Sequence, residues 1–476
     1  MVFSSLFFVL LFLPVCLVVY RFVGGIKKKN IVMLVFSLVF YAWAGPKYVV
    51  LLLGMVLIAW LGALAFSRFK ERKKIVLAIT VGLMLFLIGY FKYAGFILTG
   101  FNALTGLPKV VPEIVLPIGI SFYTFQLISY VVDVFRGEVN AQRKYWLLLL
   151  YAAMFFQCIA GPIVRYRDVQ KEITHRKVKN PELANGIKRF CIGLAKKAIL
   201  ANGCAVIADT FLITDDASAL SAVPAMGLWL GMLAFMLQIY LDFSAYSDMA
   251  IGMGLMIGFH YKENFNYPYV STSISDFWRR WHISLGSFFR DYVYIPLGGN
   301  RVGYARLIFN LFVVWFLTGL WHGASWNFIF WGLYFFAFMV LERTFLLERL
   351  RNLPVFVSHI YAMVVVYFGW IIFKFERLTD IGLVFKGMFG FNHNTFSSMT
   401  VGLTFRNNLF FLIFAVAAST PLMKWIYGKV KTATSKNGRV PYLIYAYDIV
   451  APVVLLILSI FALVGNSYNP FLYFRF

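Results

Sequence analysis

IVLAITVGLMLFLIGY, residues Ile75–Tyr90, is a stretch without a single charged side chain. Comparable apolar runs follow at Val223–Leu241, Leu307–Leu320 and Ile449–Val464. Each run approaches or reaches the roughly 20 residues that a helix needs to cross the hydrocarbon core of a bilayer. Because the apolar residues are continuous and do not alternate with polar ones, they predict helices and exclude a membrane β-barrel. The sequence therefore predicts an all-α, polytopic membrane protein.

The composition of the whole chain supports this prediction. Of its 476 residues, 61% are hydrophobic and 13% are charged, whereas soluble domains carry about 25% charged residues. A formal net charge of +24 would favour nucleic-acid binding in a soluble protein. Here the basic residues form short clusters between apolar runs, as expected for cytoplasmic loops, so nucleic acid is not an expected partner. These clusters are Lys27–Lys29, Arg68–Lys74, Arg165–Arg189 and Lys424–Arg439.

The ends of the apolar runs predict about 10–12 transmembrane helices and about two broken elements. Trp146–Ile163 has basic residues on both sides, so it should be re-entrant or a tight hairpin. Charges, Trp and Phe interleave in Tyr261–Arg301, a pattern suited to interfacial or re-entrant helices. Such elements are tolerated where backbone is buried in protein or lines a wet cavity. Further spans are expected near Ile360–Phe373, Leu409–Tyr427 and Tyr442–Val464.

The domain organisation, the cysteines and the N-terminus are simple to interpret. No internal repeat is visible, so residues 1–476 are expected to form one domain with core motifs at 116–166 and 264–332. The start, Met1–Tyr20, is expected to be an uncleaved first span. The cysteines show no metal-ligand spacing, so no metal site is expected. They are Cys16, Cys158, Cys191 and Cys204.

His322 is the centre of the part of the sequence that carries chemistry. It lies in LWHGASW, residues Leu320–Trp326, between two apolar runs. The small residues around it allow backbone or ligand to approach closely. An ionisable side chain at such depth is a functional-site candidate. From the residues alone, a neutral histidine hydrogen-bonded inside a helix bundle, or one at a wet interface, explains the pattern about equally well.

A second histidine, His282, ends the segment DFWRRWH, residues Asp276–His282. Arginines such as Arg279 and Arg280 can hold a phosphate or a carboxylate with two parallel hydrogen bonds. Ordinary anchoring, with Trp and Arg at the level of the lipid headgroups, explains these residues somewhat better when they are taken alone. The segment therefore indicates either a site or an interfacial anchor.

Other polar residues near the apolar runs also have two interpretations. Arg290 and Asp291 lie in Phe288–Arg301, which ends in a Pro and Gly-Gly turn, and they fit either a site or a local ion pair. Asp242 and Asp248 follow the run that ends at Leu241. A solvated helix end explains these two carboxylates about as well as a site role does.

Several ordered motifs together resemble one family. The resemblance is to the bacterial branch of the membrane-bound O-acyltransferase family, and within it to the membrane subunits of alginate O-acetyltransferases. It is strong over about residues 1–340 and rests mainly on hydropathy beyond them. The motifs are LPIGISFYTFQ (116–126), IAGPIVRY (159–166), NYPY (266–269), DFWRRWH (276–282), FRDYVYIPLGG (289–299) and LWHG (320–323).

This resemblance implies a site and a path for the reactants. In that family the position matching His322 is the essential histidine, and the one matching His282 is a supporting polar residue. The resemblance also implies a central funnel, open to an acyl donor from the cytoplasm and to an acceptor from outside. It implies a bacterial cytoplasmic (inner) membrane and an extracytoplasmic esterase-like (SGNH-type) partner.

The expected function is O-acetylation of an exported cell-envelope polysaccharide, such as alginate or peptidoglycan. The acetyl group would come from a cytoplasmic thioester such as acetyl-CoA, with no bound cofactor and with lipids around the helices. His322 would act as general base or as brief acyl carrier, and His282 would orient the donor or stabilise the oxyanion. Two alternatives are D-alanyl or other acyl transfer on the same fold, and a polysaccharide exporter without enzymatic activity. Residues expected to bind substrate or donor are Gln126, Trp278, Arg279, Arg280, Arg290, Asp291, Tyr292, Trp321 and Trp326.

Overall fold

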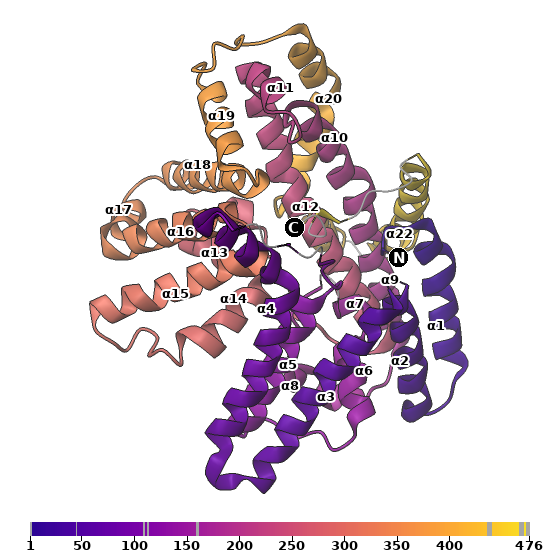
Figure 1. Ribbon diagram of the computed structural model, residues 1–476. Coiled ribbons are helices and arrows are strands. Elements are labelled where there is room, and N and C mark those ends of the chain that lie inside the picture. The colour runs from indigo at the N-terminus through magenta and orange to yellow at the C-terminus, as the bar shows by residue number, and fades with distance from the viewer. Residues whose placement is uncertain are drawn as a thin grey trace. The chain divides into compact units, whose positions relative to one another are not determined.

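The computed structural model describes residues 2–43, 45–107, 110–111, 114–158, 161–435, 440–465 and 471–472. All regular elements in these ranges are helices (Figure 1). The chain forms two compact units. Unit 1 comprises Met1–Phe190, Tyr246–Glu263 and Ser287–Pro296, and unit 2 comprises Cys191–Ala245, Asn264–Gly286 and Leu297–Phe476. The single domain expected from the sequence stays a prediction.

The helices of unit 1, with 3-10 and π turns marked η, are η1 (Phe8–Phe12), α1 (Leu13–Phe22), α2 (Ile26–Ala42), α3 (Pro46–Arg68), η2 (Lys70–Arg72), α4 (Lys73–Thr105), α5 (Ile120–Arg136), α6 (Tyr145–Ala153), α7 (Phe155–Cys158), α8 (Tyr166–Thr174) and η5 (Arg290–Tyr294). Three helices contain residues of both units, namely α9 (Asn180–Ala195), α12 (Ala225–Ile257) and α14 (Ile283–Phe289).

Unit 2 contains η3 (Lys196–Ala201), α10 (Asn202–Phe211), α11 (Ala217–Ala222), η4 (Pro268–Val270), α13 (Ile274–Arg280), α15 (Tyr304–His322), α16 (Trp326–Leu341), η6 (Glu342–Leu346), α17 (Leu347–Arg351), α18 (Val355–Lys374), α19 (Leu378–Met388), α20 (Met399–Ala418), α21 (Leu422–Ser435) and α22 (Val440–Val464).

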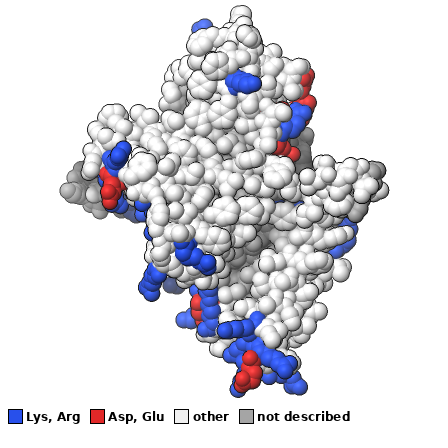
Figure 2. All heavy atoms as spheres, turned by 60° about the vertical axis from the view of Figure 1, so that its left-hand side comes forward, with Lys and Arg blue, Asp and Glu red and all other residues white. Residues whose placement is uncertain are grey.

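Nine helices in the described ranges are long and apolar enough to cross a membrane. This number is slightly below the predicted 10–12, and one further apolar helix in these ranges, Phe8–Phe22, is shorter. Figure 2 shows one face of the molecule, on which charged side chains gather in small groups beside large uncharged areas. The prediction of an all-α, multi-pass membrane protein is confirmed. The nine are Pro46–Arg68, Lys70–Thr105, Asn180–Phe211, Ala225–Ile257, Tyr304–His322, Trp326–Arg351, Val355–Lys374, Met399–Ala418 and Ile444–Val464.

The apolar run Trp146–Ile163 is broken, as predicted. Helix α6 ends before Met154, whose backbone is not helical (ψ 115°), and the four-residue helix α7 follows. The break is buried in protein, and Cβ at Gly161 would lie 2.8 Å from the Phe156 carbonyl oxygen, so glycine permits the close approach. Ile159 and Ala160 lie outside the described residues. The re-entrant path through a bilayer stays a prediction.

Helix α12 is much longer than the predicted run Val223–Leu241. Asp242 therefore lies inside the helix, is 1% exposed and forms an ion pair with Lys197 Nζ at 2.7 Å. Asp248 also lies inside the helix and pairs with Arg189 Nη2 at 3.0 Å. The solvated helix end considered for both carboxylates is wrong. The helix continues past both carboxylates because Arg189 and Lys197 pair with them, and a carboxylate inside a protein is tolerated when it is paired.

The predicted span Leu409–Tyr427 is also wrong. Helix α20 ends at Ala418 and α21 begins at Leu422. Between them the hydroxyls of Ser419 and Thr420 donate to the carbonyls of Ala415 and Ala417, and Pro421 has no N–H to continue the helical pattern. The apolar composition hides this break, since the residues on either side are those of a continuous span.

Candidate active site

The segment from Asn264 to Ser284 folds into a closed loop within unit 2. Its two ends are joined by hydrogen bonds from the Asn266 N–H to the Arg280 carbonyl and from the Ile283 N–H to the Asn264 carbonyl, both 2.9 Å long. Inside the loop, Ser273 caps helix α13 by accepting from the Asp276 N–H at 3.0 Å. This loop contains the conspicuous DFWRRWH motif. Short helices are present in this region, whereas the interpretation that they are interfacial or re-entrant stays a prediction.

Glu342, which the sequence did not single out, anchors the start of α13. Its carboxylate accepts hydrogen bonds from the backbone N–H groups of Ile274 (2.5 Å) and Ser275 (2.8 Å) and from the Ser275 hydroxyl (2.6 Å). The side chain of Tyr361 adds a contact at 3.3 Å. Glu342 is 1% exposed, so these donors replace the water that a carboxylate needs. Helix α13 is thereby held at its first turn by a buried charge.

His282 is buried at the end of this loop, with a left-handed backbone (φ 44°) that is uncommon outside glycine. Its Nδ1 lies 3.3 Å from Asn264 Oδ1 and accepts from the Leu285 N–H at 3.4 Å. Burial lowers the pKa of His282 to about 3, because an apolar environment disfavours the charged ring. His282 is therefore neutral at physiological pH. In the described part of the chain its Nε2 has no hydrogen-bond partner.

His322 is the last residue of α15, and aromatic rings surround it. Its ring centroid lies 4.8 Å from that of Trp331 and 5.1 Å from that of Phe373, both edge to face. Helix α15 packs closely on α16 (Figure 1): Cβ at Gly332 would lie 2.5 Å from the Trp315 carbonyl oxygen. Gly323 packs under Phe328, where a Cβ would overlap the ring. The expectation that small residues permit close approach around His322 agrees with this packing.

One aromatic side chain, Trp321, contacts both histidines. The Trp321 ring lies 5.5 Å from His282 and 5.0 Å from His322, measured between centroids. Phe243 lies 4.8 Å from His282 and also lines a small cavity beside His322. This cavity holds about 20 Å³, room for about one water molecule. It is lined by Ile239, Phe243, Trp281, His322, Trp370, Phe373, Phe471 and Leu472.

Residues far from His322 in the sequence form part of the wall of this cavity. Phe471 and Leu472 form part of its wall, and the Leu472 N–H donates to Asp242 Oδ2 at 2.7 Å. Asp242, which also pairs with Lys197, therefore holds part of the wall of the cavity. No pattern in the sequence indicated this contact, since the two residues lie 230 positions apart in the chain.

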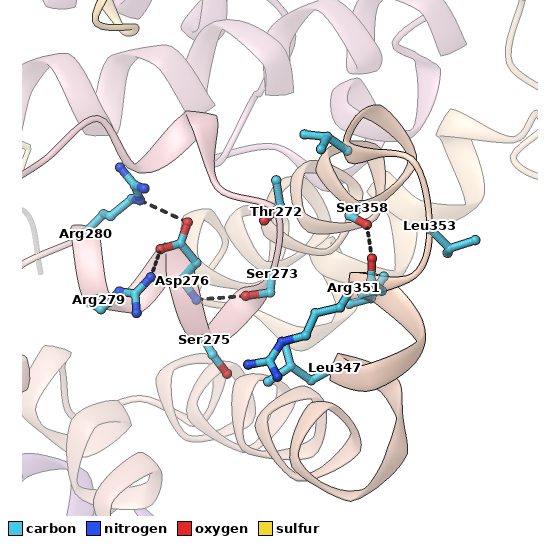
Figure 3. Close-up of a pocket in the computed structure, with 12 residues that line it drawn as sticks. Thr272, Ser273, Ser275, Asp276, Arg279, Arg280, Leu347, Arg351, Leu353 and Ser358 are labelled. Carbon is cyan, nitrogen blue, oxygen red and sulfur yellow. Dashed lines mark hydrogen bonds and ion pairs between the residues drawn. The ribbon is translucent and has the colours of Figure 1, made fainter.

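The other predicted residues of unit 2 occupy three environments. Trp278 packs among Trp315, Trp331 and Phe335 with centroids about 5 Å apart. Trp326 is 57% exposed and packs on Phe330, so its ring lies at the surface. Arg279 and Arg280 bond to Asp276 at 2.5 and 3.0 Å and line a second, larger cavity (Figure 3).

The predicted residues Gln126, Arg290, Asp291 and Tyr292 belong to unit 1. Asp291 pairs with Arg290 at 2.7 Å and with Arg165 at 2.6 Å, as one of the two sequence interpretations expected. Burial opposes ionisation of Asp291, but the hydrogen bonds from Arg290 and Arg165 outweigh it and lower its pKa. Tyr292 donates to Asp133 at 2.7 Å. Gln126 is fully buried. Arg290, Asp291 and Tyr292 thus belong to a polar cluster inside unit 1.

Fold and site together define a class: a multi-pass helical membrane protein with a histidine facing a small cavity of aromatic and aliphatic side chains. Residues 141–385 match the membrane-bound O-acyltransferase family. The chain belongs to this family, as the motifs predicted. It is therefore an O-acyltransferase, and the exporter without enzymatic activity is set aside.

Similar proteins whose names state an acyltransferase activity support this assignment. The chain is 37% identical to the probable alginate O-acetylase of Azotobacter vinelandii, with 100% of each chain covered. It is 32% identical to the peptidoglycan O-acetyltransferase of Helicobacter pylori, over 82% of this chain and 80% of that protein. Identity to the teichoic acid D-alanyltransferase of Bacillus subtilis is 31%, over 48% of this chain and 59% of that protein.

Proposed function

We propose that this chain transfers an acetyl group from a cytoplasmic thioester, acetyl-CoA, to hydroxyl groups of an exported cell-envelope polysaccharide. The observation that carries the proposal is His322 facing a cavity at the end of α15, inside a chain that aligns over its full length with an alginate O-acetylase. The similarity to a peptidoglycan O-acetyltransferase supports the same acyl group on a second type of polymer.

In the proposed reaction, His322 acts as the general base. It takes the proton of the acceptor hydroxyl while the oxygen attacks the thioester carbonyl. As the intermediate collapses, the C–S bond breaks, and the leaving thiolate receives the proton from His322. A neutral His282 would donate from Nε2 to the developing oxyanion, which suits a buried ring nitrogen with no hydrogen-bond partner among the described residues. Transient acylation of His322 is the other route to the same product.

The path and the partners are proposed from the same family membership. A central funnel would bring the donor from the cytoplasm and the acceptor from outside, across a bacterial inner membrane. An extracytoplasmic esterase-like protein would pass the acetyl group to the polymer or receive it first. The similarity to a teichoic acid D-alanyltransferase over about half the chain keeps D-alanyl transfer as the second candidate.

The decisive experiment replaces His322 with Ala. Purified protein is incubated with radiolabelled acetyl-CoA and an oligosaccharide acceptor, and labelled ester is counted. Loss of a general base should lower the rate at least ~100-fold, while the elution profile in detergent stays monodisperse. His393→Asn is the matched control, because His393 is exposed and Asn tolerates its left-handed backbone. Activity of His322→Ala near that of the control would remove His322 from the mechanism. A D-alanyl carrier protein in place of acetyl-CoA tests the second candidate.

A further inference from the structure

The larger cavity of unit 2 lies between α13 on one side and α17 with the start of α18 on the other (Figure 3). Its volume is about 370 Å³, within the range of roughly 300–1,000 Å³ typical of small-molecule sites. It is distinct from the cavity beside His322, and the two have no lining residue in common. The mechanism proposed above leaves it without an assigned ligand.

The charges that line this cavity favour an anion. Three arginines, Arg279, Arg280 and Arg351, and one carboxylate, Asp276, lie in its wall. Asp276 bonds to Arg279 through Oδ1 and to Arg280 through Oδ2, so it fixes both guanidinium groups from one side. Arg351 forms no ion pair within the part of the chain that the structure describes. The wall therefore carries an excess of two positive charges, three minus one.

The rest of the lining is divided between hydroxyl and aliphatic side chains. Ser275 and Ser358 stand among the polar residues, whereas Leu347 and Leu350 belong to an apolar wall supplied by α17. In Figure 3 the guanidinium of Arg351 extends toward Ser275, beside Leu347. A multidentate cationic wall is suited to phosphate oxygens, and the aliphatic side is suited to a hydrocarbon part of the same molecule.

Three consecutive residues connect the larger cavity with the cavity beside His322. Arg279 and Arg280 line the larger cavity, and the next residue, Trp281, lines the cavity beside His322. Both cavities thus share one short piece of backbone, which Glu342 holds at the start of α13. A ligand bound between the arginines would therefore contact the helix that leads directly to the histidine site.

We propose that this cavity binds the phosphate of a molecule that is also partly apolar, with Arg279, Arg280 and Arg351 as its cationic partners. Two sources have this chemistry. One is the phosphate of the thioester donor, and this source rests on the proposed function. The other is the headgroup of an anionic phospholipid, for which basic pockets beside membrane helices are suited.

Arg351→Gln in the full-length protein tests the proposal, with Arg349→Gln as the matched control. Both arginines are exposed on α17, but Arg349 contacts the ring of Phe345 and lies outside the cavity lining. In one arm, CoA is titrated calorimetrically into protein held in zwitterionic nanodiscs. In the other, native mass spectrometry measures retention of phosphatidylglycerol against phosphatidylcholine. Both arms are repeated with His322→Ala, so that binding is measured without turnover.

Loss of one charge-assisted contact in Arg351→Gln should weaken the binding of CoA or phosphatidylglycerol about tenfold. The affinity of Arg349→Gln should stay within about twofold of that of the unmodified protein. If Arg351→Gln weakens the binding of CoA alone, the ligand is the donor phosphate. If it weakens the binding of phosphatidylglycerol alone, the ligand is a lipid headgroup. Unchanged binding of both probes in Arg351→Gln and in Arg279→Gln/Arg351→Gln overturns the proposal, as does an equal loss in Arg349→Gln. If His322→Ala is inactive but still binds the ligand, the binding site is established independently of the proposed reaction.

Discussion

Burial makes the charge state of His282 a source of pH-dependent stability. The folded protein keeps this ring neutral down to a pKa of about 3, whereas an unfolded chain protonates it below about 6.5. Between these values the unfolded state binds more protons, so folding stability falls as pH drops through that window and is independent of His282 above it. We expect a loss of up to about 1.4 kcal/mol per pH unit below 6.5.

Denaturant unfolding at pH 7.5 and pH 5 measures this effect. His282→Gln removes the titrating group while keeping a side chain that hydrogen-bonds, so it should lose distinctly less stability between the two pH values than the unmodified protein. An identical loss in both proteins would show that other groups cause the pH dependence.

Glu342 is expected to act on the reaction by positioning α13. In Glu342→Gln an amide NH₂ would face backbone N–H groups of Ile274 and Ser275, which now donate to the carboxylate. We expect a stability loss of about 1.5–3 kcal/mol and a lower kcat, with a smaller change in the KM for the acyl donor. Glu348→Gln, on the exposed face of α17, is the control. A variant that loses stability but retains the kcat of the control would assign Glu342 a purely structural role.

Among helices, the contact of α15 with α16 is the one on which the position of His322 depends. Gly332→Ala would place a methyl group 2.5 Å from the Trp315 carbonyl oxygen and force the helices apart. We expect a stability loss of about 1–3 kcal/mol and a clear fall in acetyl transfer. Gly402→Ala in α20 meets no atom within 4 Å and should be neutral or slightly stabilising. Equal activity of the two variants would contradict the idea that this contact positions His322.

Hydrophobic runs were sufficient to predict most spans, because a bilayer selects for length and apolarity. They could not predict that α12 continues through Asp242, since the neutralising Lys197 is distant in the sequence. They also missed the break at Pro421, where composition stays apolar. The motif around His322 could be found because an ionisable residue is conspicuous between apolar runs. Glu342 could not, because a carboxylate at the end of such a run resembles an ordinary interfacial charge.

For the molecule as a whole, the basic clusters predict which ends of the spans face the cytoplasm. Helix α4 (Lys73–Thr105) begins beside the cluster Arg68–Lys74, so its two ends should lie on opposite sides of the membrane. Cysteine introduced at Leu104, which is 89% exposed, should react with an impermeant maleimide in intact spheroplasts. Cysteine at Lys70 should react only after lysis, with the unmodified protein as background. The reverse labelling pattern would invert the topology and place the donor on the wrong side.

The small size of the cavity beside His322 has a consequence for how the donor is handled. A thioester next to an activating imidazole would be hydrolysed wastefully if water had free access. With about 20 Å³ between aromatic and aliphatic side chains, this cavity has room for about one water molecule. In the proposed reaction, so small a space would keep bulk water away from the thioester and so limit its hydrolysis.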